Sequence, residues 1–187
     1  VGATALGSNA SSEGAGAVAL GQGARTHDSA NFAIALGYQA EVKPDATEVA
    51  SAGIAIGQAS RTTRIDGIAL GHGAYDEGRS AMSIGTNSHV TRDGQDSIAM
   101  GTNAQVSAAA SVAMGLNAVV SGASSLALGA GSDTPSNNSV GIGSSTTAQG
   151  HQSVAIGDKA NAGWVEEVDL GNGGKKYVYH GVGAIGI

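Results

Sequence analysis

A unit of 14 residues is repeated along nearly the whole of this 187-residue chain. The clearest copies read small polar residue, aliphatic, alanine, aliphatic, glycine, as in Ser153-Val154-Ala155-Ile156-Gly157. We call the glycine that ends this motif the anchor glycine. The anchor glycines are Gly7, Gly21, Gly37, Gly57, Gly71, Gly85, Gly101, Gly115, Gly129, Gly143 and Gly157, with a poor further copy at Gly171. A repeat this short predicts a quasi-one-dimensional stack in which each copy contacts its neighbours.

The motif itself predicts a β-strand. The residue before the anchor glycine is aliphatic in every copy up to Gly157, and the residue two positions earlier is apolar in all but the first, which has Thr4. The residue between them is small, most often alanine. This period of two places the large side chains on one face of the strand and the small ones on the other. Helices are disfavoured because 31 residues are glycine, and each interior glycine costs a helix about 1 kcal/mol.

A second short strand is predicted after each anchor glycine. A small residue stands three positions after the glycine, and two positions further on stands Val or Thr in most copies, as in Val106 and Thr62. The anchor glycine suits a turn that needs a positive φ or a close approach of backbone. Fourteen residues fit two strands of about five residues joined by two tight turns.

The fixed period favours coils stacked in register over a ladder of hairpins. Because strands in a sheet lie about 4.8 Å apart, twelve coils would form a rod of roughly 55–60 Å. Such a thin stack has a narrow core. We therefore expect its flat alanine-lined face, or the adjoining sheet, to be covered by other subunits, since an isolated stack would expose an unusual amount of apolar surface.

Three copies carry insertions. The largest adds six residues between Gly37 and Gly57, around residues 41–48, where Pro44 prevents ladder hydrogen bonding and predicts a loop that leaves the coil. Two extra residues lie near residues 24–31 and two near residues 89–93. Insertions in solenoids form loops, which are tolerated surface bulges in most cases and binding surfaces in others.

The repeat fades after Gly157. Residues 164–170 and 175–180 are strand-like runs on either side of Gly171-Asn172-Gly173-Gly174, a pattern that predicts a β-hairpin with charged Lys175 and Lys176 at its edge. Residues 183–187 resemble a truncated repeat. The sequence thus divides into repeat coils over residues 1–162 and, over residues 163–187, a hairpin-like cap or the start of an adjoining module.

Composition argues against several function classes. There is no cysteine, the net charge is −6, and no apolar run of 18 residues occurs, so we expect no thiol chemistry, no nucleic-acid partner and no membrane contact by this fragment. Asp66 and Asp96 stand at the same offset from their anchor glycines, but an intervening coil would hold them about 10 Å apart. The remaining acids are interpreted as solvated surface groups; they include Glu13, Asp28, Asp76, Glu77 and Asp133.

No metal or cofactor site is predicted either. The five histidines occupy different offsets and form no column, whereas a metal needs convergent ligands. The GxGxxG match at residues 181–186 lacks the strand and helix that give the motif its meaning. We assign no catalytic, cofactor-binding or metal-ligating residues, and the sequence is not that of an enzyme.

The strings Asn138-Ser139-Val140-Gly141-Ile142-Gly143 and Gln152-Ser153-Val154-Ala155-Ile156-Gly157 resemble the Asn-Ser-Val-Ala-Ile-Gly-x-x-Ser repeat of YadA-like heads, which belong to the trimeric autotransporter adhesins of Gram-negative bacteria. The resemblance extends over about residues 5–162. It implies an all-β fold, a left-handed parallel β-roll of about 14-residue coils, with three chains wound about a common axis.

The same resemblance implies a function and a location. It implies a homotrimeric head displayed on the bacterial cell surface, with the outer-membrane anchor outside this fragment. It also implies adhesion to host matrix proteins of the collagen, fibronectin and laminin class, or to cell surfaces. Two alternatives remain open from the residues: a β-solenoid ice binder, which needs a regular threonine array, and a β-helix enzyme acting on polysaccharides, which needs clustered charged residues in a groove.

Overall fold

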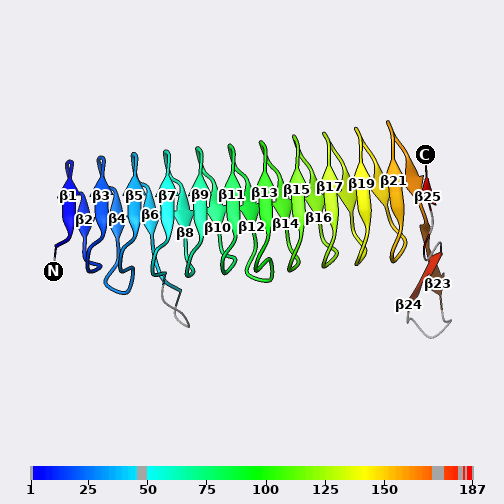
Figure 1. Cartoon of the computed structure of the whole chain (residues 1–187), viewed down its shortest axis with the longest axis horizontal. Helices are drawn as coiled ribbons and strands as arrows, with labels where there is room; N and C mark the ends of the chain where they lie inside the picture. The colour runs from blue at the N-terminus through cyan, green and yellow to red at the C-terminus, as the bar shows by residue number, and fades with distance from the viewer. Residues whose placement is uncertain (1, 46–49, 170–174, 181–182, 184, 187) are drawn as a thin grey trace.

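The computed structural model describes residues 2–45, 50–169, 175–180, 183 and 185–186, and the side chains outside residues 164–182. The described chain is all-β, and its coils stack side by side into a straight rod (Figure 1). Each coil supplies one strand to a 12-stranded sheet and one to an 11-stranded sheet, and both sheets are parallel throughout. The prediction of stacked coils in register is confirmed, and the hairpin ladder is excluded for residues 4–162.

The 12-stranded sheet, sheet A, is built from the motif that ends at each anchor glycine. Equivalent positions of successive motifs pair directly, as Ala99 does with Ala113, and the register survives the insertion between Ile34 and Ile54. Its strands are β1 (Thr4–Leu6), β3 (Val18–Leu20), β5 (Ile34–Leu36), β7 (Ile54–Ile56), β9 (Ile68–Leu70), β11 (Met82–Ile84), β13 (Ile98–Met100), β15 (Val112–Met114), β17 (Leu126–Leu128), β19 (Val140–Ile142), β21 (Val154–Ile156) and β25 (Ile185–Gly186).

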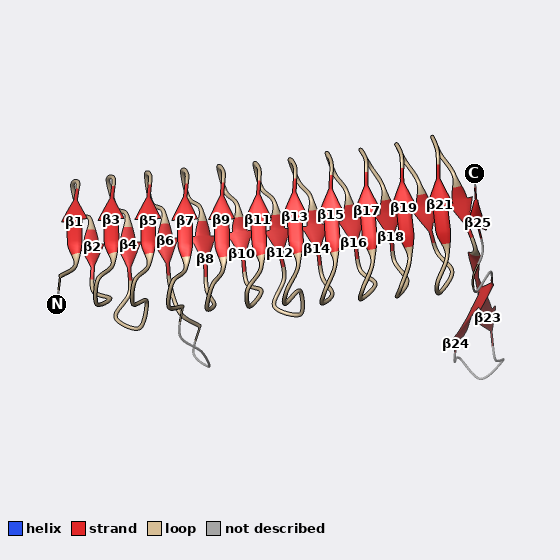
Figure 2. Cartoon of the chain, viewed as in Figure 1, coloured by secondary structure: helices blue, strands red, loops and turns tan. Residues whose placement is uncertain are grey.

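The 11-stranded sheet, sheet B, is built from the second strand of each coil and packs across the narrow interior from sheet A (Figure 2). Its strands are β2 (Ser11–Ser12), β4 (Arg25–Thr26), β6 (Glu41–Val42), β8 (Arg61–Thr62), β10 (Tyr75–Asp76), β12 (His89–Val90), β14 (Gln105–Val106), β16 (Val119–Val120), β18 (Asp133–Thr134), β20 (Thr147–Ala148) and β22 (Asn161–Ala162). Strands β23 (Trp164–Asp169) and β24 (Lys175–His180) form the predicted antiparallel hairpin.

The alanine-lined face of sheet A lies inside the roll, so the expectation that other subunits cover that face is wrong. Ala99, Ala113 and Ala127 are fully buried, while the aliphatic residues on either side of each are half-buried or exposed. Across the interior they meet a column of small and medium side chains from sheet B, including Val106 and Val120. The two sheets are close enough that the interior holds alanine from sheet A against side chains no larger than Val, Thr or Asp from sheet B, and the large aliphatic side chains of sheet A point outward.

The anchor glycines permit the close approach of successive coils, as expected. All have φ between 123° and 141°, a region that L side chains rarely adopt. A Cβ added to Gly71 would lie 2.6 Å from the carbonyl oxygen of Gly85 in the next coil. The glycine column therefore serves both purposes predicted for it, an unusual backbone angle and backbone-to-backbone packing.

Both turns of each coil hold a residue in the left-handed region, which explains why Asn and Gly are frequent in the turn after sheet A; the turn before sheet A accepts more varied residues. In the turn before sheet A these residues include Asp66, Asp96 and Asn138, and in the turn after it they include Asn103 and Asn117. The φ values of these non-glycine residues lie between 52° and 58°. The residue just before the five-residue motif therefore varies in type but keeps the same backbone conformation, and Asp66 and Asp96 stand in turns.

A buried serine ladder connects the coils in the second half of the rod. Ser111 Oγ donates to the carbonyl oxygen of Gly122 at 2.9 Å and accepts the backbone N–H of Ser125 at 3.2 Å. Ser125 Oγ repeats the pattern with Ser136 O at 2.9 Å and the N–H of Ser139 at 3.1 Å. Each hydroxyl satisfies two buried backbone groups, so the serine that opens the motif has a structural role in these coils. The earlier coils have Ala or Gly at this position.

The insertions and the C-terminal segment follow the predicted plan in part. All three insertions fall in turns that lead from sheet B back to sheet A, and Pro44 stands two residues after the end of β6. Most of the insertion tip, residues 46–49, lies outside the described residues. The poor repeat copy near Gly171 does not form a coil, since Val168 and Asp169 belong to β23; sheet A instead continues with Ile185 and Gly186, which pair with β21.

Candidate interaction surfaces

The outer face of sheet A carries two parallel columns of aliphatic side chains along the whole rod. They flank the buried central column, and several are more than a third exposed. The exposed members are Leu6, Ile34, Leu36, Leu70, Met82, Met114, Leu128, Ile156 and Ile185. A strip of this length and regularity is larger than a soluble monomer usually leaves in water, so it marks an interaction surface.

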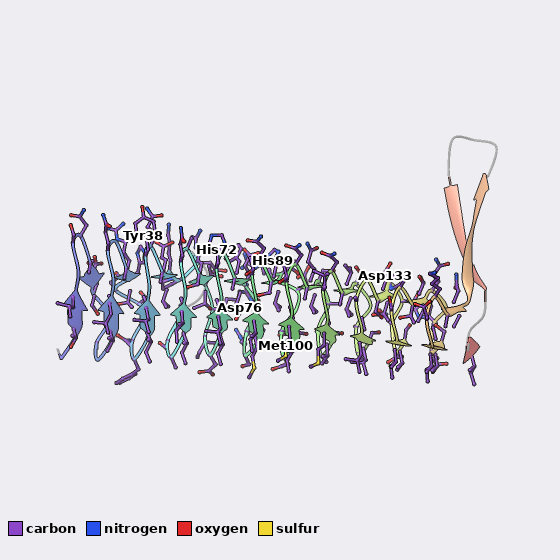
Figure 3. The ribbon with its side chains drawn as sticks, turned by 90° about the horizontal axis from the view of Figure 1, so that it is seen from above. Tyr38, His72, Asp76, His89, Met100 and Asp133 are labelled. Carbon is purple, nitrogen blue, oxygen red and sulfur yellow. The ribbon has the colours of Figure 1, made fainter. Side chains whose placement is uncertain are left out.

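The outer face of sheet B has the opposite chemistry. Its outward column runs through Arg25, Glu41, Arg61, Tyr75 and His89, which occupy the first position of successive strands. Glu41 accepts ion pairs from Arg61 at 3.2 Å and from His27 at 2.8 Å. Figure 3 shows that Tyr38, His72 and His89 lie on the opposite long side of the rod from Met100. The rod therefore has one apolar and one polar face.

Tyr75 and His89 form an ordered pair in the polar column. Their rings are stacked with centroids 5.1 Å apart and an interplanar angle of 2°. The Arg61 guanidinium lies over the Tyr75 ring, 5.6 Å from its centroid. Glu77 accepts the Tyr75 hydroxyl at 2.7 Å and contacts His89 Nε2 at 3.0 Å. Burial and the Glu77 carboxylate raise the pKa of Tyr75 to about 12.

The largest insertion folds against the cationic residues of later coils. Asp45 Oδ2 lies 3.4 Å from Arg64 Nη2 and 3.3 Å from Arg92 Nη2. A cavity of about 240 Å³ lies beside these pairs, and its walls include Lys43, Arg61 and Arg92. A second, more open hollow of about 500 Å³ lies near the N-terminal end of sheet B and is bordered by Arg25 and Glu41.

Asp76 is the acid that sequence reasoning placed wrongly. It was interpreted as a solvated surface group, but its side chain is fully buried between the sheets (Figure 3). It occupies the interior column that most other coils fill with Val or Thr, and that offset was the signal in the sequence. Desolvation raises its pKa to about 7, and the backbone N–H of Gly78, 3.0 Å from Oδ1, opposes the shift.

The interior around Asp76 is adapted to it. Asp76 Oδ2 and the hydroxyl of Thr62, its register partner, are buried without a hydrogen-bond partner among the described residues. Gly67 borders both, and a Cβ there would lie 2.6 Å from Asp76 Oδ2. Glycine at this position leaves room for the two polar side chains.

The other acids and the histidines form separate pairs or single groups along the rod and do not converge on one site among the described residues. Asp133 lies on sheet B, where partial burial raises its pKa. Within the described part of the chain, no group of three or more His, Cys, Asp or Glu residues is arranged to hold a metal ion. No helix among the described residues is long and apolar enough to cross a membrane. The GxGxxG match at residues 181–186 falls partly outside the described residues.

Comparison with known protein families identifies the repeat from which the roll is built. A family model described as the YadA head domain repeat, in two copies, matches residues 1–24, 51–74, 77–104, 93–118, 107–132 and 136–160. No curated protein matches the chain. The matched segments cover more than half of the sequence and follow the coils of the roll. This chain belongs to the YadA head family, the head domains of trimeric autotransporter adhesins.

Proposed function

We propose that this chain is a non-enzymatic adhesion module, the head of a trimeric autotransporter adhesin displayed outside the bacterial outer membrane. Its ligands are host matrix proteins of the collagen, fibronectin and laminin class or a host cell surface. Family membership supports this function, and the rigid periodic scaffold suits a domain that presents a large surface at a distance from the cell.

The observation that carries the proposal is the aliphatic strip on sheet A. Leu70, Met114 and Leu128 are 36% to 41% exposed in the single chain, and equivalent residues continue the strip along the rod. Three left-handed rolls with their sheets A toward a common axis would bury this strip. Sheet B, with its Arg, Glu, Tyr and His column, would then face outward and be available for ligands.

Solid-phase binding tests the adhesive function. The folded protein is titrated onto immobilised collagen, fibronectin and laminin and onto host cells, with heat-unfolded protein as the control. The proposal expects saturable binding to at least one of these surfaces. Absence of saturable binding to all four overturns adhesion by this head.

Residues 163–187 are proposed to act as a cap for the repeat coils or as the start of an adjoining module. Strand β22 ends at Ala162, and the hairpin begins at Trp164, so the roll and the hairpin meet at a single residue. Deleting residues 164–182 tests the capping role. A cap predicts lower thermal stability of the remaining coils, whereas unchanged stability contradicts it.

A further inference from the structure

The cavity of about 240 Å³ beside the largest insertion gathers positive charge in a chain that is negative as a whole. Four of the nine Lys and Arg residues line it: Lys43, Arg61, Arg64 and Arg92. Among the described residues, the carboxylates in its lining are Asp45 and Glu77, and Glu41 pairs with Arg61 beside it. Since the net charge of the chain is −6, this cluster is a local concentration of cations in an acidic chain.

The cluster is assembled by the parts of the chain that depart from the repeat. Lys43 and Asp45 come from the six-residue insertion, and Arg92 comes from the insertion that follows β12. The intervening coils contribute Arg61 and Arg64. The two insertions thus flank the coils that carry Arg61 and Arg64. Neither insertion is needed to continue the coils, because the strand register of sheet A is kept across each of them.

Internal contacts hold these cations in place. Asp45 pairs with both Arg64 and Arg92, and the Arg64 side chain is only 11% exposed. Arg61 is oriented by Glu41 and by the face of Tyr75. Arg92 remains 55% exposed and Arg61 38% exposed, so their guanidinium groups border the opening. A site ordered in this way loses less side-chain entropy when an anion binds.

We propose that this cavity binds an acidic polysaccharide through its sulfate or carboxylate groups. The volume lies just below the range of about 300–1,000 Å³ typical of small-molecule pockets, which suits one charged sugar of a longer chain. Planar guanidinium groups match carboxylate and sulfate oxygens in bidentate geometry. The inference rests on the proposed adhesive function and names the chemical class that this part of the head binds.

Binding of heparin and hyaluronan octasaccharides, measured by titration calorimetry on the folded protein, tests the site. The variant K43Q/R92Q removes two cations from the cavity. The matched control R25Q/K159Q removes two cations elsewhere and reaches the same net charge. The expected result is a loss of affinity of about tenfold or more in K43Q/R92Q and a change within about twofold in the control.

Each probe has a defined outcome. Binding of heparin alone identifies sulfate as the required group, and binding of both octasaccharides identifies carboxylate as sufficient; both results support the site. Equal losses in the two variants, or no binding of either octasaccharide by the wild type, overturn it. Sodium sulfate that binds the wild type without any octasaccharide binding shows an adventitious ion only, which also overturns it.

Two further measurements keep the inferences separate. The variant R92K retains the charge but lacks the planar guanidinium, so its affinity should fall between those of the wild type and K43Q/R92Q. Circular dichroism checks that each variant folds. Matrix-protein binding is measured on the same preparations. If the wild type binds matrix proteins but neither octasaccharide, the glycan site is overturned and the proposed function stands. If the wild type binds neither matrix proteins nor octasaccharides, both proposals are overturned.

Discussion

At the scale of single residues, the roll depends on a few columns of equivalent positions in successive coils, where the size of the side chain decides whether the coils can pack. The anchor glycines have no room for a Cβ against the next coil, and the interior accepts Ala, Ser, Thr and Val but no larger apolar side chain among the described residues. Asp76 is an exception in charge and not in size. Its burial makes the stability of the roll dependent on pH.

Asp76 should destabilise the folded protein as pH rises. Its folded-state pKa of about 7 exceeds the usual 3.8, so between these values the folded state keeps a proton that the unfolded state has lost. Stability therefore falls as pH rises from about 4 to about 7 and levels off above, by on the order of 3–4 kcal/mol. D76N should remove most of this fall in urea midpoints measured at pH 5 and pH 8. The control D96N, in an exposed turn, should retain it; a wild type that is equally stable at both pH values contradicts the account.

The anchor glycines should be far less tolerant of alanine than glycines in the turns. G71A places a Cβ 2.6 Å from the carbonyl oxygen of Gly85, which forces two coils apart and should cost several kcal/mol. G131A is the control, because its φ of +65° is strained for alanine while the nearest atom, Ser145 Oγ, is 3.6 Å away. We expect it to cost about 1 kcal/mol. Thermal melts compare the two, and equal losses would show that coil spacing is not set at the anchor.

At the scale of strands, the sequence predicts which residues alternate but not which face points inward. The strands of sheet A from β1 to β21, such as β15, have three residues and those of sheet B have two, and the period of two at the motif is unambiguous. The usual rule that large apolar side chains lie inside fails here. The roll is so thin that its interior fits alanine, and the aliphatic side chains form its outer surface.

The two faces of β15 can be told apart by mutation. A113E buries an unpaired charge between the sheets and should cost several kcal/mol, enough to prevent folding of this part of the roll. M114K changes the next residue, which is 36% exposed, and should leave the coil folded while weakening assembly. Circular dichroism and solution mass separate the outcomes. If M114K unfolds the protein and A113E does not, the orientation of the strand is wrong.

The candidate sites were predictable to different degrees. The insertion at residues 41–48 is visible as a break in the period, yet its contact with Arg92 joins loops from separate coils and has no signal in the spacing. Asp76 stands at an offset that elsewhere holds Val or Thr, and this offset predicts burial once the inner face is known. The stacking of Tyr75 on His89 follows directly from the register of β10 and β12.

At the scale of the whole molecule, the two faces of the rod differ in chemistry and suit two different roles. Sheet A presents aliphatic columns from Leu6 to Ile185, which favours burial against other chains. Sheet B presents ion pairs, stacked rings and the cation-lined cavity, which favours contact with solvent and ligands. Repetition extends both faces along the same axis, so the proposed assembly and binding would be distributed over many coils.

Solution mass tests the central claim, that sheet A is an assembly surface. Light scattering after gel filtration is applied to the wild type and to the double variant M114K/L128K, which places two charges on the aliphatic strip of each chain. With a chain mass of 18.1 kDa, the account predicts a wild-type trimer of about 54 kDa and a folded variant of lower mass. A wild type that is folded and remains at 18.1 kDa at micromolar concentration would contradict it.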